Sequence, residues 1–331
     1  RLTSMAVAAS LRSITRTTGL ARAVAPVVQV AASPVMEQRR FAESLSALKT
    51  RIKATANVAK LTGVMKLVAS SKLRAAEETL NKAKPFGASL LQSVTTKEIF
   101  AAEDEKGVEV ETKGAGHRRL VMVLTTDRGL CGPVNSSMSR GMHRYIAELK
   151  KAGEDITLVV CGDKGRMQIA REHGDITAFT VDSAFDKDPI FELASAVAQR
   201  VVSRDFDTLT LAFNEFINAA KFNNVRYHFP QIGGLPVGVL PERFAGYDVE
   251  PENNEEVLVN LMEYAVGGSF FYAMLESQAC EISQRVTAMD NASTNAGDMV
   301  DRFTLQYNRA RQAKITTELT EIISGAESLE Q

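Results

Sequence analysis

The last quarter of the chain carries a seam of apolar and small residues that repeats every three or four positions. The repeat starts near Asn253 and has a slip after Leu275. Its members are Val257, Leu261, Tyr264, Gly268, Phe271, Leu275, Ala279, Ile282, Val286, Met289, Ser293, Ala296, Val300, Phe303, Tyr307, Ala310, Ile315, Leu319, Ile322 and Ala326. This spacing is typical of a coiled coil. About 75 helical residues at about 1.5 Å each span about 110 Å, so the helix over 253–329 needs a partner outside any small domain.

A second helical pattern covers residues 43–97 and provides that partner. Its predicted seam contains Leu45, Leu48, Ile52, Ala56, Ala59, Gly63 and Lys66, widened by Leu61, Met65, Val68, Leu73, Ala76 and Leu80. We therefore expect an antiparallel coiled coil between the two ends of the chain. Gly267 and Gly268 interrupt the C-terminal helix, where each glycine costs up to about 1 kcal/mol, so a kink or a tight helix crossing is expected there.

The middle of the chain, residues 118–250, follows a different pattern after a charged, glycine-containing loop over 101–117. Short apolar runs alternate with helical stretches. The expected strands are 120–125, 156–161, 176–181, 208–217 and 225–229, with helices at about 133–151, after Gly165, and at 189–204. Continuous apolar strands alternating with helices indicate a largely parallel sheet. The fold class is α/β: a central Rossmann-like domain plus the long antiparallel coiled coil.

The glycine turns of this domain do not match a nucleotide-binding motif. Neither GxGxxG nor GxxxxGK[ST] is present, so Gly129–Gly132 and Gly162–Gly165 are interpreted as strand-to-helix turns, with Asp163 available as a helix cap. The four histidines are scattered, and the three cysteines form neither a zinc motif nor a disulfide framework. We expect no cofactor, no metal and no catalytic residue, which favours a mechanical or binding role.

Charge is balanced overall but uneven along the chain. There are 39 basic and 40 acidic residues, which removes global basicity as evidence for nucleic-acid binding. Residues 44–74, however, contain basic residues and no acid, whereas 244–284 contain acids and no Lys or Arg. The basic helix is expected to face an acidic neighbour, the alternative being a basic surface facing solvent. No apolar run reaches the roughly 18 residues that a membrane span needs.

The first 41 residues differ in composition from the rest. They are rich in Arg, Ser, Thr and Ala and contain no acid before Glu37. This composition predicts a mitochondrial transit peptide over 1–41, with Arg39 and Arg40 just before a cut ahead of Ala42. A disordered tail is the alternative.

Four motifs resemble the gamma subunit of F-type ATP synthases, in the right order over about residues 43–329. They are the stretch from Lys60 to Arg74, the turn from Thr125 to Gly132, the stretch from Leu275 through Arg285 to Ala292, and the terminal run from Tyr307 to Ala326. Together with the leader, the resemblance points to the mitochondrial form. Pro133 and the glycine pair at 267–268 depart from the family pattern.

The resemblance implies a non-catalytic rotor shaft that couples proton-driven c-ring rotation to catalytic sites on beta subunits. Its implied partners are the hexameric alpha and beta ring, the delta and epsilon subunits and the c-subunit ring, on the matrix side of the mitochondrial inner membrane. It implies no nucleic-acid partner and no membrane span of its own. Contacts with the ring would come from Met65, Lys66, Arg285, Arg311, Gln312, Thr316 and Glu318. Residues 322–326 would run in an apolar bearing.

Two other function classes remain open from the residues alone. One is a coiled-coil adaptor or nucleic-acid clamp that uses the basic helix 44–74, although no aromatic residues are interleaved there. The other is an α/β enzyme with coiled-coil arms, which a phosphate-binding loop would have supported.

Overall fold

A computed structural model describes residues 34–100, 112–185, 188–229 and 255–328. The chain divides into two compact units, which are treated separately: Leu48–Arg309, and a smaller unit that combines Arg1–Ala47 with Ala310–Gln331. The predicted leader falls mostly on residues 1–33, outside the described residues, and it stays a prediction. No helix in the described ranges combines the length and apolar character that crossing a membrane requires.

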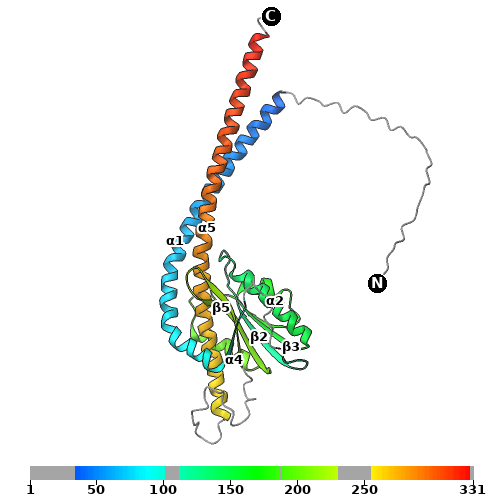
Figure 1. The fold of residues 1–331 in the computed structure, drawn as a ribbon, viewed down its shortest axis with the longest axis vertical. Helices are drawn as coiled ribbons and strands as arrows, with labels where there is room; N and C mark the ends of the chain where they lie inside the picture. Colours follow the sequence, from blue (N-terminus) through cyan, green and yellow to red (C-terminus); the bar gives the residue numbers. More distant parts are fainter. Residues whose placement is uncertain (1–33, 101–111, 186–187, 230–254, 329–331) are drawn as a thin grey trace, which may run out of the picture. The chain divides into compact units, whose positions relative to one another are not determined.

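Two long helices are present, as predicted. Helix α1 runs over Pro34–Val94 and continues through Pro85, and α5 runs over Glu255–Glu327 (Figure 1). Within the larger unit they are antiparallel, because Ser293 of α5 donates to the carbonyl of Ala59 at 3.3 Å whereas Tyr272, twenty-one residues earlier, packs against Gly87. The antiparallel pairing of the two chain ends is confirmed here.

The predicted seams are only partly correct. On α5 the positions from Ile282 to Ala310 are buried or half-buried, as expected. The outlying positions of that seam are exposed in this chain: Leu261, Tyr264, Ile315, Leu319 and Ile322. On α1, four predicted members are also exposed: Ala56, Leu61, Met65 and Val68. These four positions are exposed because the covered stripe of α1 passes instead through Thr55 and Thr62, which are half-buried, and Ala69, which is buried. A helix turns only one face toward each partner.

The glycine pair at 267–268 marks a tight helix crossing. A Cβ on Gly268 would lie 2.7 Å from a methyl carbon of Leu90, and a Cβ on Gly87 would lie 2.2 Å from the ring of Tyr272. The rings of Phe86 and Tyr264 pack edge to face beside them, with centroids 6.2 Å apart. Helix α5 runs through this region without a break, so the crossing, rather than a kink, is what the glycines provide.

The domain is built on a six-stranded sheet in the order β1-β6-β5-β2-β3-β4. The strands are β1 Thr96–Ile99, β2 Arg118–Leu124, β3 Asp155–Cys161, β4 Thr177–Val181, β5 Thr208–Phe216 and β6 Phe222–Phe229. Strands β5, β2, β3 and β4 pair in parallel, as predicted, and β1 and β6 add an antiparallel edge. Strand β1 was not predicted from the sequence. It lies at the edge of the sheet, and its residues TKEI therefore lack an apolar run.

Alternation along the strands divides the interior into two cores. Leu120, Met122 and Leu124 of β2 face α1, α4 (Phe191–Val202) and α5, whereas Val121 and Val123 face α2 (Val134–Ala152). Successive strand side chains point to opposite faces, so a continuously apolar strand requires cover on both sides. The domain therefore has three layers, with α2 on the opposite face of the sheet from α5 (Figure 1).

The segment after β3 differs from its prediction. In place of a full helix it forms the short helix α3 (Asp163–Gly165) followed by the π-helix η1 (Arg166–Ala170). Asp163 is not a cap, because Gly162 takes the N-cap position without a side-chain hydrogen bond and Asp163 pairs with Arg166 instead. Gly162 is required here: its φ is +102°, and a Cβ would lie 2.7 Å from the carbonyl oxygen of Thr125.

Candidate partner-binding surface

The turn after β2, residues 125–132, is held by the carboxylate of Asp127. Its Oδ1 accepts a hydrogen bond from the amide of Asp163 at 3.0 Å, and its Oδ2 accepts one from the amide of Phe185. The amide of Gly165 donates to the hydroxyl of Thr125 at 2.8 Å. The amides of Asp163 and Gly165 thus donate to side chains of the turn after β2. Both glycine segments follow a strand and lead into a helix, as the sequence predicted.

The same turn projects Leu130 outward. Leu130 has a φ of +63° and is 63% exposed, although its neighbour Cys131 is buried. A left-handed backbone is uncommon for a bulky non-glycine residue and is retained where the surroundings impose it. An apolar side chain held in this way at a surface indicates a contact with another molecule. The sequence reading did not single out Leu130, although its place between Gly129 and Gly132 was the available signal.

Arg285 of α5 lies directly beside this turn. It donates to the carbonyl of Gly129 at 3.3 Å and pairs with the carboxylate of Glu281 one helical turn earlier. Burial raises the pKa of Glu281, and the nearby Arg285 acts in the opposite direction. Arg285 is therefore partly committed within the chain, since it compensates a buried carboxyl group.

An apolar groove with basic residues at its edge runs from α1 across to this turn. Its apolar members are Val64, Met65, Val68, Ala69, Leu130 and Ile282, and its basic members are Lys72, Arg128 and Arg285. We call these residues the α1–turn groove. It brings together Met65 and Arg285, two of the residues that the family resemblance assigns to partner contact.

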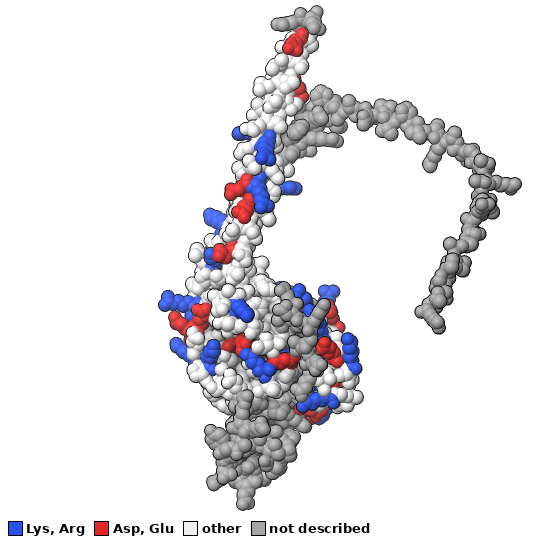
Figure 2. Space-filling view, viewed as in Figure 1, with Lys and Arg blue, Asp and Glu red and all other residues white. Residues whose placement is uncertain are grey.

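Lys66 points away from the groove. Its amine lies 2.7 Å from the carboxylate of Asp290 on α5, so the acidic neighbour expected for the basic helix comes, at this position, from the same chain. Arg74 pairs at 3.5 Å with Glu78 on its own helix. Over the α/β domain, the face drawn in Figure 2 mixes basic and acidic side chains.

The outer surface of α1 exposes further large apolar side chains. They are Val58, Leu61, Val64, Leu67 and Val68, with Leu67 70% exposed. A solvent-facing helix normally carries polar residues at such positions, and contiguous apolar surface marks an interaction site. This surface adjoins the α1–turn groove through Val64 and Val68.

The remaining candidate residues lie near the end of α5, in the smaller unit. Arg311, Gln312 and Thr316 are exposed, and the hydroxyl of Thr316 donates to the carbonyl of Gln312 at 3.0 Å. Glu318 is half-buried and lies 3.5 Å from the amine of Lys314. The side chains of Arg311 and Gln312 are therefore presented outward.

The thiols of the domain are buried. Cys131, Cys161 and Cys280 are free. Burial raises the pKa of Cys161 to about 12, which keeps this thiol protonated and inert at neutral pH.

Known proteins resemble this chain over most of its length. Residues 44–329 match the protein-family model described as ATP synthase. The ATP synthase gamma chain of Paracoccus denitrificans is 38% identical over 297 residues, covering 86% of this chain and 99% of the relative. The gamma subunit of the mitochondrial ATP synthase F(1) complex of Rattus norvegicus is 34% identical over 289 residues, covering 87% and 100%.

Solved structures share the fold. A chain of the Euglena gracilis mitochondrial ATP synthase, in an assembly of OSCP, F1 and c-ring, has a TM-score of 0.68 at 17% identity and covers 87% of this chain and 95% of its own. A chain of the Tetrahymena thermophila central stalk and c-ring has a TM-score of 0.54 at 27% identity, with coverage of 70% and 99%.

Proposed function

The chain belongs to the ATP synthase gamma-chain family, and from this premise we propose that it is the central rotor shaft of a mitochondrial ATP synthase. Its ends would sit inside the alternating alpha and beta subunits, and its α/β domain would sit on the c-subunit ring beside the delta and epsilon subunits. It would work on the matrix side of the inner membrane, after removal of the leader over 1–41. This family role replaces the adaptor, nucleic-acid clamp and enzyme alternatives.

The observation that carries the proposal is the unpartnered apolar surface of α1 beside the α1–turn groove. Leu67 is 70% exposed, and Leu130 is held outward from a strained turn. Exposed apolar side chains do not stabilise a protein that acts alone. A shaft that turns inside a ring, by contrast, needs an apolar contact surface with low friction. The basic side chains that line the groove suit the acidic neighbour that the sequence predicts for the basic helix.

The mechanism is differential binding. A shaft without threefold symmetry presents a different side to each of three identical catalytic sites, so each site adopts a different open or closed population. Rotation moves these populations around the ring, and coupling is a free energy shared between shaft and site. The chain itself contributes contact, orientation and torque, and the nucleotide chemistry belongs to the beta subunits.

The proposed contacts differ in how they can be tested. Arg311 and Gln312 project outward, so their truncation removes partner contacts with little effect on the fold of this chain. Arg285 also compensates the buried Glu281, so Arg285→Ala alone would mix a lost contact with an unpaired buried carboxylate. Met65, Lys66, Thr316 and Glu318 complete the proposed set, with Lys66 acting mainly through its ion pair to Asp290.

The decisive experiment compares ATP synthesis by membrane-reconstituted complexes at a fixed proton gradient. Arg311→Ala combined with Gln312→Ala is expected to lower the rate of synthesis severalfold, with the complex still assembled. The matched control is Arg302→Ala with Gln306→Ala, two exposed side chains of the same types on the same helix. Wild-type synthesis in the first double variant, or an equal loss in both, would remove this assignment.

Arg285 is tested against its own internal partner. Arg285→Ala is measured beside the double variant Arg285→Ala with Glu281→Gln, in which the buried carboxylate is neutralised as well. A coupling defect that persists in the double variant belongs to a contact of Arg285 with the ring. Full recovery in the double variant would instead assign Arg285 to the stability of this chain.

A further inference from the structure

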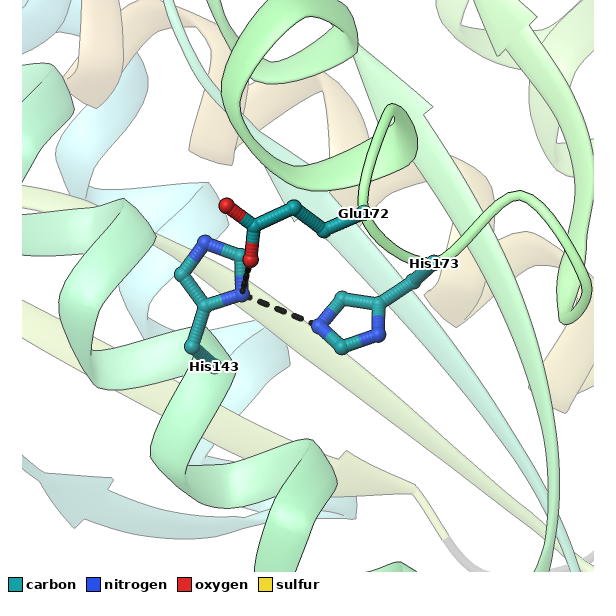
Figure 3. Close-up of side chains that lie close together, drawn as sticks. All are labelled: His143, Glu172 and His173. Carbon is teal, nitrogen blue, oxygen red and sulfur yellow. Dashed lines mark hydrogen bonds and ion pairs between the residues drawn. The ribbon is translucent and has the colours of Figure 1, made fainter.

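Two histidines and a glutamate meet on the face of the α/β domain remote from α5. His143 lies on α2, and Glu172 and His173 lie in the turn between η1 and β4. Their ligand atoms all lie within 4.8 Å of one another (Figure 3). No motif in the sequence indicates this group, because thirty residues separate the two histidines.

The distances within the group are those of atoms that share a small cation. Nδ1 of His143 lies 2.9 Å from Nε2 of His173 and 3.4 Å from a carboxylate oxygen of Glu172 (Figure 3). Ligands bound at about 2.0–2.2 Å to a tetrahedral zinc ion lie roughly 3.3–3.5 Å apart. The Glu172–His143 distance matches this spacing, and the two histidine nitrogens would have to separate by about 0.5 Å to admit the ion.

The second ring nitrogen of His143 already has the partner that a metal ligand needs. Nε2 of His143 lies 3.2 Å from the hydroxyl of Ser139, one turn earlier on α2. Histidines that bind metals almost always donate their remaining N–H to an oxygen, which fixes the tautomer and the ring orientation. With Nε2–H directed at Ser139, the lone pair of Nδ1 faces Glu172 and His173.

The backbone holds the other two ligands in place. The amides of Glu172 and His173 both donate to the carbonyl of Ile169 at 3.1 Å, and the carbonyl of His173 accepts from the hydroxyl of Thr177 at 2.7 Å. The preceding π-helix η1 is a rare conformation that occurs frequently at functional sites. The two ligand-bearing segments are therefore fixed before any ion binds.

The site is open to solvent. The side chain of Glu172 is 68% exposed and that of His143 is half-buried. These two residues line a surface hollow with Ser139, Met167, Gln168 and Arg171. An ion can therefore reach the group from solvent.

We propose that His143, Glu172 and His173 bind one divalent transition-metal ion of the zinc class. Two imidazole nitrogens and one carboxylate oxygen leave at least one coordination position for water, and this set of donors suits Zn²⁺ better than Mg²⁺ or Ca²⁺, which prefer oxygen ligands. The bound ion links α2 to the turn that leads into β4. It acts as a clip on the domain, separate from the partner-binding surface on α1 and α5.

The test uses the full chain, stripped of metal with a chelator and titrated with Zn²⁺ by calorimetry at pH 7.4. One saturable site is expected. His143→Gln and Glu172→Gln should each weaken Zn²⁺ binding at least tenfold, and Ser139→Ala should weaken it less.

Two matched controls separate the site from general histidine and carboxylate binding. His117→Gln changes a histidine that hydrogen-bonds Thr208 in the loop before β2, and Glu148→Gln changes an exposed glutamate on α2. Both should bind Zn²⁺ as the wild-type chain does. Co²⁺ added in place of Zn²⁺ should show visible absorption bands with the wild-type chain and the controls, and these bands should disappear in the site variants.

Two outcomes would overturn the proposal. The first is no saturable Zn²⁺ binding by the folded wild-type chain, which would reduce the cluster to a histidine hydrogen bond. The second is equal binding by the wild-type chain and the site variants, which would place the ion elsewhere. Glu172→Gln keeps the test valid if His143→Gln fails to fold, because the Glu172 side chain is mostly exposed.

Discussion

The α/β domain buries its apolar side chains, whereas the outer surface of α1 exposes them. In the domain, β2 buries every residue from Leu120 to Leu124 between two helical layers. On α1, apolar residues from Val58 to Val68 remain exposed, although the same helix buries Leu80 and Leu91 farther along. The first region encloses its apolar side chains on both faces of the sheet, and the second leaves them on the surface of this chain.

This difference in burial separates the residues that stabilise the fold from those that are available for function. Burying a leucine stabilises a fold in proportion to the apolar area removed from water, so the buried strands and the helices that cover them supply most of the stability of the chain. The exposed part of α1 contributes little of that free energy within this chain. Substitutions in the two regions should therefore affect different measurements, namely unfolding of the chain and activity of the assembled complex.

The largest expected difference comes from two leucines with the same substitution. Leu124→Ala empties a fully buried position and should lower the free energy of unfolding by about 2–5 kcal/mol. Leu67→Ala changes a side chain that is 70% exposed and should alter that free energy by less than about 0.5 kcal/mol. Urea unfolding of the full chain, followed by circular dichroism, measures both. Equal losses of unfolding free energy would contradict the expected difference, because Leu67 would then be packed within the chain.

A smaller difference is expected between two glycines in helix interiors. Gly87→Ala places a Cβ 2.2 Å from the ring of Tyr272, and overpacking of this kind costs about 1–3 kcal/mol. Gly297→Ala on α5 meets no atom within 4 Å and should stabilise the helix by about 0.5–1 kcal/mol. Opposite shifts of the thermal midpoint are the expected result. Shifts of the same sign would contradict the tight crossing of α1 and α5.

The end of the sheet at which β2 and β5 begin should be sensitive to acid. Asp207, just before β5, accepts hydrogen bonds from the guanidinium and the amide of Arg118, each at 2.9 Å, and these contacts lower its pKa from 3.8 to about 2. A carboxyl group with a depressed folded-state pKa stabilises the fold above pH 3.8, and this contribution is lost as the pH falls toward 2.

Asp207→Asn should therefore flatten the pH dependence of stability within that window. Thermal midpoints at intervals from pH 5 to pH 2.5 provide the measurement, with Asp205→Asn as the control because Asp205 lies 4.0 Å from Arg118 and is almost fully exposed. An unchanged slope in Asp207→Asn would show that other carboxyl groups dominate acid unfolding.

The smallest effects are expected from ion pairs on the helical pair. Lys66→Met breaks the pair with Asp290 between α1 and α5, and Arg74→Met breaks the pair with Glu78 within α1. Exposed pairs contribute about 0–1 kcal/mol, and the pair between helices should be the larger of the two. Unfolding in 0.05 M and 1 M salt checks this order, because added salt screens both pairs.

Local patterns in the sequence determined much of the fold. The long helices follow from the repeat of apolar residues every three or four positions. The strands from β2 to β6 and their largely parallel order follow from short apolar runs that alternate with helical stretches. The family motifs indicated Met65 and Arg285 before any geometry was available. The edge strand β1 was not predicted because its residues TKEI form no apolar run. The π-helix η1 was not predicted because a π-helix has no simple sequence signature.

Which residues come into contact depends on how the helices and strands pack together. This packing turns Lys66 toward Asp290, sets Arg285 against Glu281 and Gly129, exposes Leu130, and joins His143 to Glu172 and His173. Secondary structure and tertiary contacts depend on residues at different separations along the chain. A helix or a strand is specified by neighbours a few residues apart, whereas a groove, an ion pair between helices or a metal site depends on packing between segments that are distant along the chain.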